Sequence, residues 1–399
     1  MRSESMRIAV FSEIYAPYTG GISSYIEILA KGLTDLGHNV LIVTSNTKIK
    51  KPVQQNGILW CPAKKSRNQF GVACKNNRRT VKLIMQWKPD IIHIHADTAI
   101  GEMGYLIADK MNIPSVFTIH DFYLERFVSE RFGFVRRFKT WMALRHFRDA
   151  IDNTTLLSAS CMRAQEYVEA AGRKKRIFHV PINTDKFQFD YRLVPEQTIQ
   201  KIRSRLRIPP DTSIAVFAGR IEPDKNLKYL LREWKQYINE SDKLHLVIAG
   251  KGSDVPALKK LVNKYRIGRM VTFTGEILHS EMPQFLSACD IYVSGDDGGL
   301  SSMAVQEALA CGLPAVLRKN QYNQEIIIHR VTGFLYETPE EFGKIMRMLS
   351  SSTPSQKLIL RNVVRRNSYD KVMNYHLARY TIKSYEAARK KFYKPKNYR

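Results

Sequence analysis

The sequence predicts an α/β protein with two domains, each built on a parallel β-sheet. Short β-branched runs alternate with helical patterns, and this alternation favours βαβ units with parallel strands. The pattern begins at Arg7 and starts again at Ser213, after a polar stretch that contains Pro209 and Pro210. With 399 residues, the chain has room for two domains of ordinary size and a large buried core.

Composition indicates a globular protein with an anionic partner. Hydrophobic residues make up 44% of the chain, and no low-complexity tract interrupts it. The 63 Lys and Arg against 37 Asp and Glu leave a net charge of +26, which suits a nucleic acid, an anionic membrane surface or an anionic substrate. No apolar run approaches the eighteen or so residues of a membrane span, and the N-terminus does not resemble a signal peptide. Five cysteines without a CxxC pair favour a reduced, cytoplasmic setting and no zinc site.

The first domain is expected to open with a strand at 7–12, a glycine-bearing loop and a helix from Ser23 to Leu36. Gly20 and Gly21 precede the helix, where a backbone can approach a phosphate or sugar closely, although a plain tight turn would explain them equally well. A later strand from Ser115 ends at His120. Because ligands of open α/β sheets bind at the carboxyl ends of strands, His120 is a candidate site residue, although strand-end histidines are often structural.

Residues 126–148 carry seven basic side chains and one acidic one, Glu130, interleaved with large aromatic residues. From Val135 onward the apolar residues recur at helical spacing, Trp141 among them. The basic residues placed largely elsewhere include Arg136, Arg137 and Lys139. Such a helix fits the headgroup boundary of an anionic membrane, and the alternative is a core-facing helix with a solvated basic face.

The stretch 294–316 reads as strand, glycine-rich turn, short helix and strand. Glu307 lies near the middle of the helix, Gly312 fits the position after its last turn, and Pro314 follows where a helix cannot continue. A turn whose N–H groups point outward from a helix N-terminus can bind an anion, and a carboxylate one or two turns later can reach sugar hydroxyls. An ordinary βαβ corner with a solvated Glu has the same shape.

Several of these motifs resemble those of the retaining GT-B glycosyltransferases of family 4. Glu307 to Pro314, Glu-Ala-Leu-Ala-Cys-Gly-Leu-Pro, matches the second half of the family's donor-site signature, and Gly219-Arg220 with Lys225-Asn-Leu matches its G-R-[LI]-x-x-x-K segment. The resemblance covers about residues 7 to 390. It implies two Rossmann-like domains facing a central cleft: 6–187, a linker at 188–204, and 205–370, with a C-terminal helix at 371–399 crossing back onto the first domain.

The resemblance also implies an activity, the transfer of a hexose from a UDP- or GDP-hexose to an acceptor hydroxyl with retention. Arg220 and Lys225 would hold the donor diphosphate and stabilise the charge of the leaving group. Glu307 would accept from the ribose hydroxyls, and His120 would lie near the sugar. The other donor-binding candidates are Gly20, Gly21, Gly219, Asp297, Gly299, Leu300 and Ser301. No metal or further cofactor is expected, because the cationic side chains supply the electrostatic stabilisation.

One position departs from the family's pattern. Gly299 stands where the family carries a Glu that contacts donor-sugar hydroxyls. Asp297 would supply a carboxylate if the turn differs by one or two residues; otherwise backbone N–H groups of 299–302 hold the sugar, or specificity has changed.

The acceptor is expected to be a membrane lipid or lipid-linked glycan, with the enzyme peripheral on the cytoplasmic face. The alternatives are a soluble glycosyltransferase acting on a polysaccharide or protein-linked glycan, and a degenerate GT-B protein that binds RNA or membrane through its basic surface. A nucleotide-cofactor oxidoreductase is disfavoured because no G-x-G-x-x-G is present. A nucleic-acid partner is disfavoured because no compact binding module is recognisable.

Overall fold

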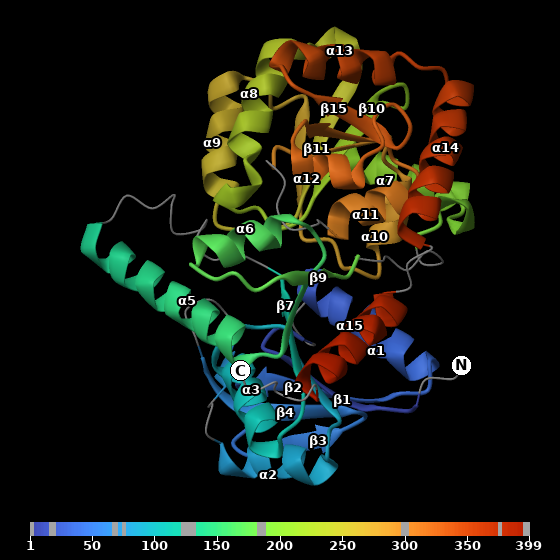
Figure 1. The fold of residues 1–399 in the computed structure, drawn as a ribbon. Helices are drawn as coiled ribbons and strands as arrows, with labels where there is room; N and C mark the ends of the chain where they lie inside the picture. The colour runs from blue at the N-terminus through green and yellow to red at the C-terminus, as the bar shows by residue number, and fades with distance from the viewer. Residues whose placement is uncertain are drawn as a thin grey trace. The chain divides into compact units, whose positions relative to one another are not determined.

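The computed structural model describes residues 4–15, 21–65, 71–73, 77–120, 133–181, 189–296, 303–373 and 377–393. The chain divides into two compact units (Figure 1). The first comprises Met1–Asn183 together with Tyr375–Arg399, and the second comprises Thr184–Asn374.

Over the described residues, the first unit contains a nine-stranded sheet in the order β3-β4-β2-β1-β6-β7-β8-β9, with β5 paired to β4. Its strands are β1 (Arg7–Ser12), β2 (Asn39–Asn46), β3 (Val53–Gln55), β4 (Ile58–Lys65), β5 (Gly71–Ala73), β6 (Ile91–Ile94), β7 (Ser115–Ile119), β8 (Leu156–Ala159) and β9 (Ile177–His179). Only the short β3 and β5 run antiparallel to their neighbour among these strands. The central strands are buried on both faces, as parallel strands covered by helices usually are. The sheet confirms the predicted α/β class.

The helices of the first unit come from both ends of the chain. They are α1 (Gly21–Asp35), α2 (Arg78–Trp87), α3 (Ala99–Met111), α5 (Gly133–Asn153), α6 (Arg163–Ala170) and α15 (Leu377–Phe392). Helix α15 packs against α1, where a Cβ on Gly32 would lie 2.9 Å from the Cβ of Ala378. Small residues at this contact therefore let the two helices approach closely.

The second unit has a sheet in which all described strands are parallel, in the order β12-β11-β10-β13-β14-β15. Its strands are β10 (Ser213–Ala218), β11 (Leu244–Ala249), β12 (Val271–Gly275), β13 (Ile291–Val293), β14 (Ala315–Arg318) and β15 (Gly333–Tyr336). Its helices are α7 (Glu196–Leu206), α8 (Leu227–Tyr237), α9 (Val255–Tyr265), α10 (Met282–Ser287), α11 (Met303–Ala310), α12 (Gln321–Ile326), α13 (Pro339–Ser350) and α14 (Pro354–Met373). Three short 3-10 helices are η1 (Tyr191–Leu193), η2 (Pro223–Lys225) and η3 (Glu240–Asp242).

Each face of this second sheet is covered by an apolar cluster. One contains Trp234 and Phe342 from α8 and α13, and the other contains Phe285 and Leu309 from α10 and α11. Helices on both faces make the sheet doubly wound, and the strand order reverses between β10 and β13. Ligands of such sheets bind outside the carboxyl ends of the strands at that reversal.

The structure differs from the sequence-based expectation at 188–204. Instead of a linker, this stretch contains η1 and most of α7, which packs against α10 inside the second unit. No residue of α7 is fully buried, but Ile202 and Leu206 are partly buried against the core of the second unit. Arg203 anchors the helix through hydrogen bonds from its guanidinium to the carbonyl oxygens of Ala288 and Thr212 and to the carboxylate of Asp290.

The C-terminal helix belongs to the first unit, as the resemblance implies, but it spans Leu377–Phe392 rather than 371–399. Helix α14 ends at Met373 in the second unit, and α15 begins at Leu377 in the first. Val364 of α14 packs in the core of the second unit, whereas Tyr385 of α15 is buried in the first. Helical periodicity continues across 374–376, but it does not indicate which core each half contacts.

The end of α11 agrees with the prediction from sequence. Gly312 has a φ of +78°, and the backbone N–H of Leu313 donates to the carbonyl oxygen of Ala308 at 2.9 Å. This arrangement is a Schellman motif, which ends a helix with a glycine in the left-handed conformation.

Replacement of Gly312 by Ala should destabilise the second unit. A Cβ there would lie 2.6 Å from both Cγ and the carbonyl oxygen of Arg361, and φ is positive. Left-handed strain and overpacking together predict a loss of roughly 2–4 kcal/mol in the free energy of unfolding. Urea unfolding followed by tryptophan fluorescence measures it. Gly268→Ala is the matched control, because its Cβ would have no neighbour within 4 Å. Equal urea midpoints for the two variants would contradict the claim that a side chain at position 312 causes strain and overpacking.

Candidate active site

The carboxyl edge of the second sheet brings opposite charges together at the point where strand order reverses. Val216 of β10 pairs with Tyr292 of β13, so the chain leaves both strands at the same edge of the sheet, with Arg220 after β10 and Asp296 after β13. The Nζ of Lys225 lies 2.7 Å from Oδ2 of Asp296. The sheet thus holds a cationic side chain beside a carboxylate at its switch point.

Lys225 is mostly enclosed, with a second carboxylate near it. Its Nζ lies 3.5 Å from Oδ2 of Asp224, and its side chain retains 21% of its exposure. Burial works to lower the pKa of Lys225, but the neighbouring Asp296 and Asp224 carboxylates outweigh it, and the pKa lies above its ordinary value. Lys225 is therefore a fully charged ammonium at neutral pH, held at one place by Asp296.

The G-x-G at 250–252 has a backbone explanation. Gly250 has a φ of +145°, and a Cβ there would lie 1.8 Å from the carbonyl oxygen of Gly219. A Cβ on Gly252 would lie 2.0 Å from the carbonyl oxygen of Ile221. The loops after β10 and β11 therefore pack backbone to backbone. This contact supports the loop that carries Arg220 and Lys225.

Glu307 has a partner that sequence analysis did not identify. Its Oε1 lies 3.0 Å from Nε2 of His279, in the loop after β12, and the imidazole also contacts the ring of Phe189. Glu307 is largely buried, whereas His279 is about one-third exposed. His279 stands in a polar loop 28 residues before Glu307 with no motif around it, so its role is visible only in the folded chain.

The first unit places His120 in a cluster of aromatic rings. Nε2 of His120 lies 2.6 Å from Nδ1 of His95, which follows β6, and the edge of the Tyr25 ring contacts His120 at a centroid distance of 4.7 Å. Tyr25 lies one turn into α1, whose first residue is Gly21. Strand order in this sheet reverses between β1 and β6, so His95, His120 and the start of α1 surround its switch point.

Burial keeps these imidazoles neutral. It lowers the pKa of His120 to about 4 and that of His95 well below its ordinary value. Because a neutral imidazole has one donor and one acceptor nitrogen, one ring of the 2.6 Å pair donates and the other accepts. His120 is therefore a neutral, half-buried imidazole whose Nε2 is engaged with His95.

His93 ties α15 to the sheet beneath this cluster. Its Nδ1 lies 2.7 Å from the hydroxyl of Tyr385, and its Nε2 lies 2.6 Å from the hydroxyl of Thr118. The Thr118 hydroxyl in turn lies 2.6 Å from that of Ser158. Burial lowers the pKa of His93 to about 3. His93 is thus a structural residue of the first unit.

Helix α5 exposes two large aromatic residues. Phe138 and Trp141 keep 57% and 52% of their exposure, and their rings stack at a centroid distance of 6.0 Å. The guanidinium of Arg145 lies over the Trp141 ring at 5.8 Å. Toward the other end of the helix, Phe147 is buried against Phe117. Figure 1 shows the start of α5 projecting away from the first unit's sheet.

Other predicted site residues fall outside the part of the chain that the structure describes. They are Gly20, Asp297, Gly299, Leu300 and Ser301, together with the side chains of Arg136, Arg137 and Lys139. None of the helices within the described ranges is both long and apolar enough to span a bilayer.

Two family models match successive parts of the chain. The model described as Glycosyltransferase Family 4 matches residues 19–186, and the model described as Glycosyl transferases group 1 matches residues 198–369. The second match falls within the second unit, and the first covers most of the first unit and ends three residues beyond Asn183. Together they account for most of the chain.

Curated relatives match over most of their own length. An alpha-monoglucosyldiacylglycerol synthase of Acholeplasma laidlawii is 24% identical over 352 residues, covering 85% of this chain and 87% of the relative. A GDP-mannose-dependent alpha-mannosyltransferase of Mycolicibacterium smegmatis is 23% identical, covering 83% of this chain and 84% of the relative.

Solved structures show the same fold. HepE of Anabaena in complex with UDP-glucose has a TM-score of 0.71 at 16% identity, over 96% of this chain and 100% of that one. A sucrose-phosphate synthase of Thermosynechococcus elongatus has a TM-score of 0.73 at 16% identity, over 96% and 98%. The chain therefore belongs to the family 4, group 1 glycosyltransferases and is an enzyme with the GT-B fold.

Proposed function

We propose that the enzyme transfers a hexose from a UDP- or GDP-hexose to a hydroxyl of a membrane lipid or lipid-linked glycan, with retention at the anomeric carbon. The observation that carries the donor part is the position of Lys225 and Arg220 at the switch point of the second sheet. Oxygen atoms of a diphosphate are strong acceptors for ammonium and guanidinium groups. A partly enclosed lysine held in its charged form at this edge fits such a ligand.

Lys225 and Arg220 would act mainly on the leaving group. As the bond between sugar and diphosphate breaks, negative charge grows on the phosphate oxygens, and fixed cations stabilise that charge without reorganising. Asp296 keeps the Lys225 ammonium in position before the donor binds. We propose that these side chains replace a metal ion and that no cofactor takes part.

The remaining site residues would orient the donor and the acceptor. Glu307 would accept from ribose hydroxyls, with His279 fixing one of its carboxylate oxygens. His120 would lie beside the sugar as a neutral hydrogen-bonding group rather than as an acid, because burial lowers its pKa to about 4. The leaving phosphate itself would help to deprotonate the acceptor hydroxyl on the same face, which produces retention.

Two observations support a lipid acceptor. The relatives from Acholeplasma laidlawii and Streptococcus pneumoniae are both described as alpha-monoglucosyldiacylglycerol synthases. In this chain, α5 presents the stacked Phe138 and Trp141 beside Arg145. Aromatic rings next to basic groups are suited to the interface of an anionic membrane. We propose that α5 binds the cytoplasmic face of the membrane where the acceptor is embedded.

Lys225→Ala should lower turnover at least about a hundredfold, as loss of one group that stabilises transition-state charge typically does. The measurement is release of nucleoside diphosphate from a panel of UDP- and GDP-hexoses with vesicles containing diacylglycerol. Lys243→Ala is the matched control, because Lys243 forms an exposed ion pair with Asp211 at the other end of the strands.

Near-native turnover of Lys225→Ala would remove Lys225 from the mechanism. Loss of native activity on chelation with EDTA, restored by Mg²⁺, would contradict the metal-free proposal. Failure of the native protein to bind any donor of the panel would favour a degenerate site.

Acid should destabilise the first unit at pH values above those at which its carboxylates become protonated. An unfolded histidine has a pKa near 6.5, whereas His120 has about 4 in the fold. As the pH falls from 6.5 toward 4, the unfolded state therefore binds more protons, and stability falls by about 1.4 kcal/mol per pH unit for this group. Thermal unfolding at pH 7 and pH 5 measures the loss.

The variant His120→Gln removes one of the buried groups that cause this loss. Its melting temperature should therefore fall less between pH 7 and pH 5 than that of the native protein. An equal or larger fall in the variant would contradict the neutral, buried state of His120.

Replacing Arg136, Arg137 and Lys139 together by Glu should release the enzyme from anionic vesicles, because each basic residue near such a surface contributes about 1 kcal/mol. Vesicle co-sedimentation at low and physiological salt measures binding. The matched control replaces three exposed lysines of α8 and α9 by Glu: Lys235, Lys260 and Lys264. Equal loss of binding in both triple variants would indicate a net-charge effect and contradict a specific role for α5.

A further inference from the structure

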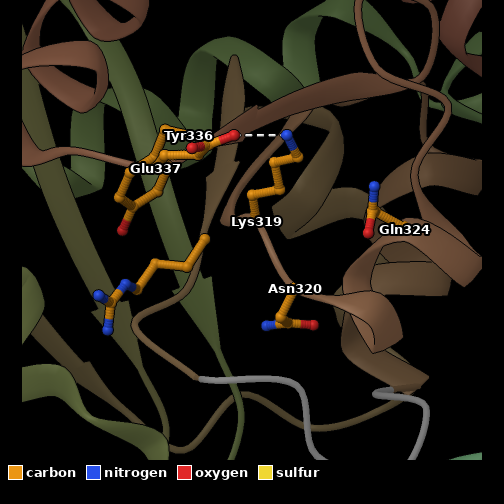
Figure 2. A pocket seen from close by; sticks show the side chains of 6 residues that line it. Lys319, Asn320, Gln324, Tyr336 and Glu337 are labelled. Atoms are coloured by element: carbon orange, nitrogen blue, oxygen red, sulfur yellow. Dashed lines mark hydrogen bonds and ion pairs between the residues drawn. The ribbon is translucent and has the colours of Figure 1, made fainter.

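A hollow lies at the carboxyl ends of β14 and β15 in the second unit (Figure 2). It has a volume of about 620 Å³. The residues that line it are Arg318, Lys319, Asn320, Gln324, Tyr336 and Glu337. Figure 2 shows Lys319 and Glu337 joined across one side of the hollow, while Asn320 and Gln324 lie on the side formed by α12. Nothing described above assigns a role to this hollow.

The strand registers place the hollow next to the proposed diphosphate site. Val293, the last residue of β13, pairs with Val316 of β14, so the segment that leads to Asp296 leaves the sheet beside the strand that leads to Lys319. Arg318 of β14 pairs with Tyr336 of β15, which puts Lys319 level with Glu337. The hollow therefore lies at the ends of the two strands that follow β13 in the sheet, and β13 leads to Asp296, the partner of Lys225.

The lining groups suit hydroxyls better than a phosphate or an apolar group. Lys319 and Gln324 supply donors, and the Glu337 carboxylate, which pairs with Lys319, supplies acceptors. A sugar hydroxyl both donates and accepts, so it can bridge such a pair. Glu337 pairs with Lys319 and so weakens the attraction of this side of the hollow for a phosphate, and an apolar ligand would displace the water that solvates these polar groups.

Two of the lining groups are held in place by contacts outside the hollow. The Asn320 side-chain oxygen accepts from the backbone N–H of Asn323 at 2.8 Å, which fixes the amide at the start of α12. The Arg318 guanidinium lies over the Tyr229 ring at 4.6 Å. Side chains fixed in this way lose less conformational entropy when a ligand binds.

We propose that this hollow binds the hexose of the donor, with Glu337 and Gln324 contacting its hydroxyl groups; the inference rests on the proposed function. The proposal also bears on position 299. The resembled family carries a sugar-binding Glu there, and this chain has Gly299. Glu337, on a strand two places along the sheet from β13, would supply a carboxylate for sugar hydroxyls in its place.

The test compares two ligands that differ only in the hexose. Calorimetric titration of the full-length protein with UDP and UDP-hexoses, and with GDP and GDP-hexoses, first identifies the donor. Glu337→Ala and Gln324→Ala are then titrated with that donor and with its nucleoside diphosphate. The control is Asp211→Asn, which breaks the exposed Lys243 pair at the opposite edge of the same sheet.

Loss of a hydrogen bond to the charged Glu337 should raise the dissociation constant of the nucleotide-hexose about tenfold or more. The nucleoside diphosphate should bind each variant as it binds the native protein, and Asp211→Asn should change neither affinity. Unchanged affinity of Glu337→Ala for the nucleotide-hexose, or an equal loss for both ligands, would overturn the hexose site while leaving the proposed function intact. Failure of the native protein to bind any nucleotide would instead overturn the proposed function and this inference with it.

Discussion

The parallel pairing of β10 with β13 is the constraint on which the second unit's chemistry depends. It places the loop that carries Arg220 and Lys225 beside Asp296, although the two segments are more than seventy residues apart. The next two strands continue this edge, where Lys319 follows β14 and pairs with Glu337, which follows β15. A diphosphate beside Lys225 and Arg220 and sugar hydroxyls beside Glu337 are the ligands that would fit this edge. Because parallel strands end at the same edge of a sheet, side chains far apart in the sequence lie along one edge in the fold.

The candidate site side chains of the first unit are neutral, largely buried imidazoles, whereas those of the second unit are charged. His93 and His95 lie with their rings 4.0 Å apart, and His95 pairs with His120. Two cations so close in a buried site would repel strongly, so the cluster is compatible only with neutral rings. Tyr385 of α15 completes the network from the other end of the chain. The last helix is therefore part of the support of His120 and not a separate appendage.

Sequence reasoning succeeded where the signal is local. The helix around Glu307 and its stop at Gly312 follow from residues within a few positions of one another, and the structure confirms both. It failed for α7, because the polar and charged composition around 188–204 indicated a linker, whereas Ile202 and Leu206 pack on the core and Arg203 anchors the helix. His279 and the hollow at Glu337 could not be predicted, because each depends on strands that become neighbours only in the folded sheet. Local patterns fix elements, whereas sites made of several elements depend on topology.

The net charge of +26 does not by itself select a membrane, because unpaired surface cations attract any polyanion and are screened within about 8 Å at physiological ionic strength. A surface that binds a membrane differs from one that binds RNA in having exposed aromatic side chains next to its basic residues. Phe138 and Trp141 are exposed on α5, and the other end of this helix is anchored in the core by Phe147. The two aromatic side chains therefore point into solvent from an anchored helix. Burial of such apolar surface contributes about 25 cal/mol per Å², and this contribution does not weaken as salt is added. The electrostatic attraction of the nearby basic residues does weaken with salt. A surface that combines apolar burial with electrostatic attraction would hold the enzyme at a bilayer when either contribution alone would be too weak.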